Sequence, residues 1–122
     1  MRIMESVIAH SDSTYRLSHL SNEALLASTR AQAGRSNHVL AALLAHLAEV
    51  ELRGLHRTRA CASLYTYCVY ELRMSEDVAL RRVHASRIAR RFPVLFERIA
   101  AGEIHLTALF GPGPHRLETV PP

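Results

Sequence analysis

The sequence has 122 residues, of which 48% are hydrophobic and 21% charged, a balance typical of a globular domain and not of a disordered chain. Trp is absent and only 6% of the residues are aromatic, so the core must consist of aliphatic side chains, which favours packed helices. A net charge of +4 arises from 15 basic residues, all Arg, against 11 acidic ones, and it is compatible with a nucleic-acid partner without requiring one. No apolar run suits a signal peptide or a membrane span, so a cytoplasmic location and no membrane partner are expected.

The first two predicted helices lie in the N-terminal half of the chain. Ser21 is expected to cap a helix that ends at Gly34. A second helix is expected to start at a Ser36 or Asn37 cap and to end at Gly54. At helical spacing its apolar residues fall on one face, which comprises Val39, Leu40, Leu43, Leu44, Leu47 and Val50. This face must be buried against other helices.

Three or four further helices follow a basic connector at 55–62. Ser63 is expected to cap the stretch "LYTYCVYELR", and Ser75 to cap a helix over 76–91. The apolar side of that helix is predicted to comprise Val78, Ala85, Ile88, Ala89 and Phe92. Pro93 is expected to open a fifth helix that Gly102 ends, and "EIHLTALF" is compatible with a short sixth helix.

The predicted fold class is therefore all-α, a compact bundle of five to six short helices that includes a helix-turn-helix-like pair. Three regions are expected along the chain. Residues 1–17 show no periodicity and are predicted to form a flexible arm, and 18–109 to form the helical domain. Residues 110–122, "FGPGPHRLETVPP", are rich in Pro and Gly and are predicted to be irregular.

The segments 63–73 and 76–91 have the spacing of a helix-turn-helix, whose second helix can enter the major groove. On a helical wheel Arg87, Arg90 and Arg91 share one arc with His84. Acidic residues in the first turn would repel phosphates, so phosphate contacts are expected from the C-terminal half. The candidate DNA-binding residues are Arg87, Arg90 and Arg91, with Arg82, Arg57 and Arg59 as lesser candidates. The alternative is a packed helix with a solvated basic face.

A second hypothesis is helix-mediated self-association into a homo-oligomer. Tyr67 and Tyr70 lie on a mostly polar helix face, where aromatic side chains can anchor an interface, unless another helix or the N-terminal arm covers them. The eight His residues are scattered, with no HExxH motif and no Cys/His cluster, so no cofactor and no catalytic residue are expected. Cys61 and Cys68 are seven residues apart, a spacing that favours buried free thiols over a metal site.

The stretches "YTYC", "LRMSED", "RRVHASRIARRFP" and "GEIHLTAL" occur in order between Ser63 and Leu109. With the earlier "LSNEALLASTRA" and "LLAHLAEVELRGL", they resemble the helical region that precedes the catalytic domain in bacterial HNH endonuclease-like proteins, most of all the myxobacterial members. The resemblance covers about residues 18–109. It implies a helical region that accompanies a nuclease and serves DNA engagement or self-association.

The resemblance carries over no catalytic residue. The family's nuclease site is a ββα-metal unit with a His general base, and a divalent metal would belong to that downstream segment, which the sequence does not contain. The change in composition after "HLTAL" suggests a truncated or frameshifted reading frame, and a fragment without independent function is a further alternative. Nuclease activity of these 122 residues by themselves is not expected.

Overall fold

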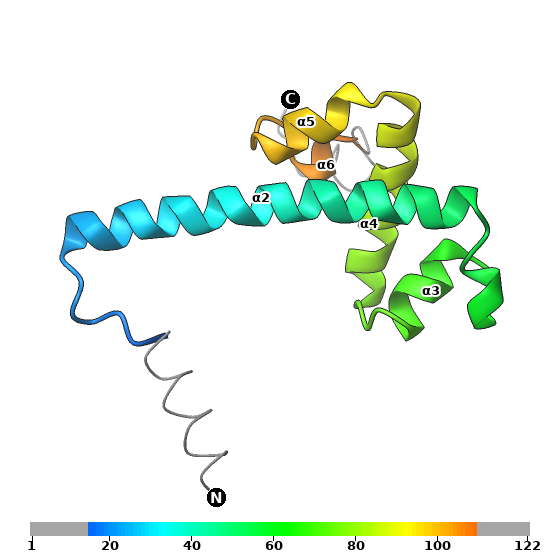
Figure 1. The fold of residues 1–122 in the computed structure, drawn as a ribbon, viewed down its shortest axis with the longest axis horizontal. Helices are drawn as coiled ribbons and strands as arrows, with labels where there is room; N and C mark the ends of the chain where they lie inside the picture. The colour runs from blue at the N-terminus through cyan, green and yellow to red at the C-terminus, as the bar shows by residue number, and fades with distance from the viewer. Residues whose placement is uncertain (1–14, 110–122) are drawn as a thin grey trace, which may run out of the picture. The chain divides into compact units, whose positions relative to one another are not determined.

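The computed structural model describes residues 15–109, which are helical and contain no strand, as the sequence predicts. Along these residues the α-helices alternate with short turns and one 3-10 turn, η1 (Figure 1). Their bounds are α2 (Asn22–Leu52), η1 (Arg57–Arg59), α3 (Leu64–Tyr70), α4 (Glu76–Arg91), α5 (Val94–Ala100) and α6 (Leu106–Leu109). The predicted tail at 110–122 and most of the predicted arm at 1–17 lie outside the described residues.

The chain divides into two compact units, residues 1–33 and 34–122, and α2 contributes residues to both. In the first unit every side chain from Ser21 to Ala33 is exposed. The apolar residues of this stretch include Leu25 and Leu26, which are 37% and 65% exposed. The buried core belongs to the second unit.

Gly34 does not end a helix, so the prediction of two separate helices in this region was wrong. α2 continues through Gly34 for 31 residues, and Ser36 and Asn37 lie inside it without acting as caps. Helix-ending glycines adopt a left-handed conformation, as Gly54 and Gly102 do here with φ of +66° and +76°. Gly34 is not among the positive-φ residues, so it costs helix propensity without breaking the helix.

The other three predicted serine caps, at Ser21, Ser63 and Ser75, are confirmed. Each accepts a hydrogen bond from a backbone N–H of the first turn, which would otherwise lack a partner inside the helix. The Oγ atoms of Ser21, Ser63 and Ser75 lie 3.1, 3.0 and 3.3 Å from the N atoms of Ala24, Thr66 and Val78. These local signals fix where three of the helices begin.

In the second unit α4 is the central helix: α3 lies beside its first turns, and α5 and α6 lie beside its last turns (Figure 1). Small side chains on α4 allow this close packing. The core that α4 shares with α2, α3 and α5 comprises Ala41, Leu44, Leu47, Leu64, Cys68, Ala79, Val83, Ala85 and Ile99. It is aliphatic, as the composition predicts.

Two of the predicted apolar faces need correction. On α4, Ala79, Val83 and Ser86 are also buried, so the packed side is wider than the sequence suggested. The buried Ser86 hydroxyl donates a hydrogen bond to the Val83 carbonyl oxygen at 2.8 Å, so this polar group has a partner within its own helix. Val39 of α2, placed on the buried face, is 67% exposed, while Leu40, Leu43 and Val50 do pack against the core.

The basic connector at 55–62 is partly folded. It contains η1, and Ala60 takes a left-handed conformation after that turn. His56 and Cys61 are buried on either side of η1, and Arg57 and Arg59 project into solvent. The His56 Nδ1 has no hydrogen-bond partner among the described residues.

Candidate nucleic-acid interface

Arg87 and Arg90 converge on Glu51, which extends from the last turn of α2. The Arg87 guanidinium donates to both carboxylate oxygens: Nε lies 3.1 and 3.2 Å from Oε1 and Oε2, and Nη2 lies 2.7 Å from Oε2. Arg90 Nη1 is 3.9 Å from Oε1. The Glu51 side chain is only 18% exposed, whereas those of Arg87 and Arg90 are 47% and 40% exposed. We call these three residues the Glu51 clamp; it joins α2 to α4.

The clamp changes the protonation behaviour of its members. The hydrogen bonds from Arg87 lower the pKa of Glu51 below its ordinary value, against the opposing effect of burial, and the charges of Arg87, Arg90 and His56 lower it further. The same hydrogen bonds raise the pKa of Arg87. Glu51 is therefore charged at neutral pH, and the clamp holds two cations and one anion, which leaves one positive charge.

Arg91 and Phe92 extend the clamp towards the end of α4. The Arg91 guanidinium carbon lies 5.7 Å from the centroid of the Phe92 ring, within cation–π range. Phe92, which the sequence placed on the apolar side, is 55% exposed. It is the C-cap of α4, and its non-helical backbone turns the chain into α5 and takes the ring out of line with the buried residues.

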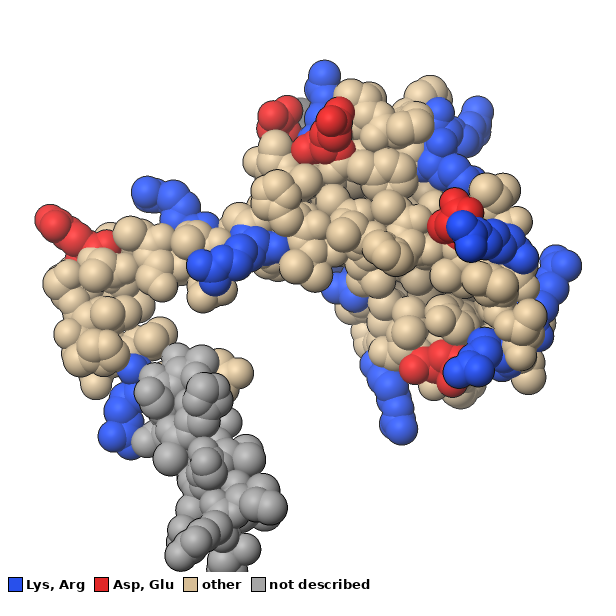
Figure 2. All heavy atoms as spheres, viewed as in Figure 1, with Lys and Arg blue, Asp and Glu red and all other residues tan. Residues whose placement is uncertain are grey.

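The three lesser candidates do not join this cluster. Arg82 is half-buried on the packed side of α4. Arg59 of η1 donates from Nε to Glu71 Oε1 at 3.2 Å and so belongs to a separate ion pair at the end of α3. Arg57 is exposed in η1. On the face of the second unit shown in Figure 2, arginines are scattered, and acidic side chains lie against some of them.

The two candidate interface tyrosines have different environments. Tyr67 is half-buried and packs against the hydrophobic core, which favours the alternative in which other helices cover it. Tyr70, at the end of α3, is 74% exposed. Of these two tyrosines, Tyr70 is therefore the one whose ring is accessible to a partner.

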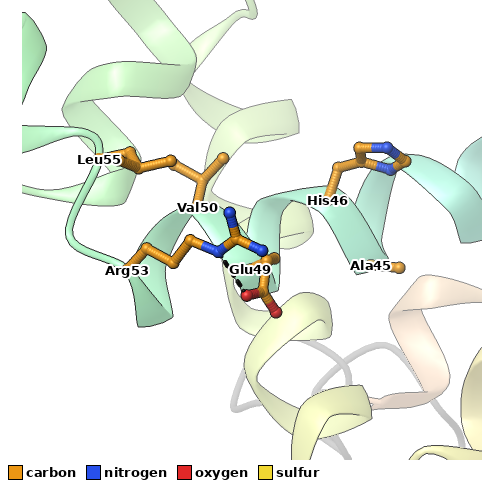
Figure 3. Close-up of a pocket in the computed structure, with 6 residues that line it drawn as sticks. All are labelled: Ala45, His46, Glu49, Val50, Arg53 and Leu55. Atoms are coloured by element: carbon orange, nitrogen blue, oxygen red, sulfur yellow. Dashed lines mark hydrogen bonds and ion pairs between the residues drawn. The ribbon is translucent and has the colours of Figure 1, made fainter.

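A pocket of about 450 Å³ lies on the outer side of the last turns of α2 (Figure 3). It is lined by Ala45, His46, Glu49, Val50, Arg53 and Leu55. Its polar groups are already used within the helix: Arg53 Nε donates to Glu49 Oε2 at 2.7 Å, and His46 Nδ1 lies 2.6 Å from the Ala42 carbonyl oxygen. The polar side chains of this pocket thus make contacts within α2 and do not converge on its interior, as the polar groups of a ligand site do.

The metal-ligating side chains of residues 15–109 lie apart from one another. Over this range no three His, Cys, Asp or Glu residues come together as a possible metal site. Burial raises the pKa of the Cys68 thiol to about 11, so it stays protonated at neutral pH and is a poor nucleophile. In the same range no helix combines the length and apolarity needed to cross a membrane.

The helical wheel groups Arg87, Arg90 and Arg91 on one arc, but it does not predict that Glu51 pairs with Arg87 and Arg90. Glu51 is 36 residues from Arg87, so no helical spacing connects them. A faint signal existed, since an acidic residue near the end of a leucine-rich helix is poorly placed for the helix dipole and needs a cation. Comparisons with protein-family models, curated proteins and solved structures give no match to this chain.

Proposed function

We propose that this chain is a helical DNA-binding region of the kind that accompanies an HNH-type nuclease, and that it contributes backbone contact and no catalysis. The observation that carries the proposal is the cluster of Arg87, Arg90 and Arg91 at the end of α4, exposed and opposed by a single carboxylate. Arginine guanidinium groups match the geometry of phosphate oxygens and supply most non-specific DNA contacts.

The Glu51 clamp supports this role by fixing its arginines. A free arginine loses side-chain entropy when it binds a phosphate, and an arginine already held by a carboxylate has lost part of it before binding. The bidentate contact uses Nε and Nη2 of Arg87, which leaves Nη1 available to a phosphate. Glu76 and Asp77 are exposed at the opposite end of α4, where they disfavour phosphates. Contact through the C-terminal half therefore favours backbone binding over base reading.

The test is a salt-titrated anisotropy assay with a labelled duplex and the full chain. The double variant Arg90→Gln/Arg91→Gln should lose about tenfold in affinity at low salt, because two phosphate contacts are removed. Arg87 stays in place so that Glu51 keeps its partner. The matched control is Arg30→Gln/Arg35→Gln, which makes the same charge change on α2 and should have a much smaller effect.

Two results would contradict the proposal. One is the absence of duplex binding at low salt by the unchanged chain. The other is an equal loss for both double variants, which would mean that only net charge matters.

Self-association is a second candidate function, favoured by the exposed side chains of residues 21–33. Leu25 and Leu26 lie in this stretch and are 37% and 65% exposed. Isolated helices of this length are marginally stable in water unless an apolar face is covered, which favours a helical partner such as a second copy. Light scattering should then show a concentration-dependent dimer that Leu25→Gln/Leu26→Gln removes. A monomer at all concentrations would contradict it.

A further inference from the structure

We propose that Arg91 and Phe92 form a stacking platform for an unpaired base, so that the chain prefers single-stranded over duplex DNA. This inference rests on the proposed function and names its substrate more closely. It starts from the exposure of an aromatic side chain. The sequence has three Phe residues, and one of them, Phe92, is 55% exposed to solvent. Leaving such a ring in water forgoes the free energy of its burial.

The position of the ring is fixed by the backbone around it. The Phe92 N–H is shared between the carbonyl oxygens of Ile88 and Ala89 at 3.0 and 3.1 Å, which closes the last turn of α4. The next residue, Pro93, is the N-cap of α5. Phe92 thus lies at the turn between α4 and α5, and its ring is exposed there. Val94, the first residue of α5, is also 53% exposed.

The surroundings of the ring favour a nucleotide. The Arg91 guanidinium sits over the Phe92 ring, and guanidinium planes and aromatic rings are the groups on which proteins stack unpaired bases. Arg90 precedes this pair by one residue, and Arg87 lies one helical turn before Arg91, so phosphates on either side of a stacked base would find cations. A charged cluster beside an apolar ring suits a flexible single strand, whose bases are available for stacking. An intact duplex keeps its bases inside.

The experiment compares a labelled oligothymidine strand and a duplex of the same length, at the same salt, by anisotropy with the full chain. Phe92→Leu keeps an apolar side chain without a π face and should lower single-strand affinity about tenfold, the effect of one stacked base, while duplex affinity changes little. Phe92→Trp should retain the affinity for the single strand. Tyr15→Leu is the matched control, because Tyr15 is an exposed aromatic residue near the start of the described residues, outside the cluster. It should change neither affinity.

The outcomes separate this inference from the proposed function. Duplex binding that depends on Arg90 and Arg91, with no preference for the single strand or no effect of Phe92→Leu on it, overturns the platform and leaves the proposed function standing. An equal loss from Tyr15→Leu also overturns the platform. Absence of binding to either DNA overturns both. Far-ultraviolet circular dichroism and thermal unfolding of each variant establish that the compared proteins are folded.

Discussion

At the residue scale, Glu51 has the most consequential contact outside the core, because its carboxylate joins α2 to α4. The pair with Arg87 is bidentate, but Arg87 is 47% exposed, so solvent screens part of the attraction. We predict a coupling free energy of about 1 kcal/mol for this pair in a double-mutant cycle of Glu51→Gln and Arg87→Gln. Urea unfolding of the four proteins would measure it. A coupling indistinguishable from zero would show that the contact does not stabilise the fold.

The same contact predicts a pH dependence of stability. The pKa of Glu51 is lowered from its ordinary value of 4.5 by Arg87, so the unfolded chain takes up a proton at this site before the folded chain does. The stabilisation from the charged carboxylate is thus complete above pH 4.5 and is lost as pH falls through the lower folded value. The difference in unfolding free energy between the unchanged chain and Glu51→Gln should shrink over that range.

A suitable control for this titration is Glu49→Gln. Glu49 lies on the same helix, and its ion pair with Arg53 is exposed on both sides, with side chains 51% and 65% accessible. Exposed pairs contribute little to stability, so Glu49→Gln should follow the unchanged chain more closely than Glu51→Gln does. If the unfolding free energies of both variants change equally with pH, the pH dependence comes from the general loss of a negative charge and not from the clamp.

At the element scale, the glycines make the sharpest prediction. Gly34 lies inside α2, is not at positive φ, and an added Cβ would meet no atom within 4 Å. Gly34→Ala should therefore stabilise the chain by up to about 1 kcal/mol through helix propensity. Gly102→Ala should destabilise it, because Gly102 is at φ +76° and its Cβ would lie 2.9 Å from Asn37 Nδ2. Thermal unfolding of both variants would measure this; a destabilising Gly34→Ala would contradict the continuity of α2.

These elements also show what the sequence could and could not predict. Ser63 and Ser75 were found because a cap is a local device that involves residues three positions apart. The prediction that a helix ends at Gly34 was wrong, because glycine permits a left-handed conformation and does not impose it. The Glu51 clamp and the exposure of Phe92 depend on how α2, α4 and α5 meet, and no local pattern contains that information. The grouping of Arg87, Arg90 and Arg91 on one arc was thus predictable. The pairing with Glu51 and the exposure of Phe92 were not.

At the scale of the whole molecule, the net positive charge is modest, and part of it lies in ion pairs. Glu49, Glu51 and Glu71 each pair with an arginine, so part of the basic excess is neutralised at the surface. A net charge of +4 spread in this way gives a weak general field. Any DNA affinity must then come from a few close phosphate contacts. Among the ion pairs of residues 15–109, the one at the end of α4 is where two arginines share a single carboxylate.

This distribution predicts how steeply duplex binding falls with salt. Each neutralised phosphate contributes a slope of roughly −0.9 to the dependence of log K on log salt concentration for duplex DNA. If Arg87, Arg90 and Arg91 each contact one phosphate, the slope should be about −3, and Arg90→Gln/Arg91→Gln should reduce it to about −1. Anisotropy titrations at several salt concentrations give both slopes directly. A steeper slope that the double variant leaves unchanged would place the phosphate contacts elsewhere, since arginines outside the end of α4 would then carry the binding.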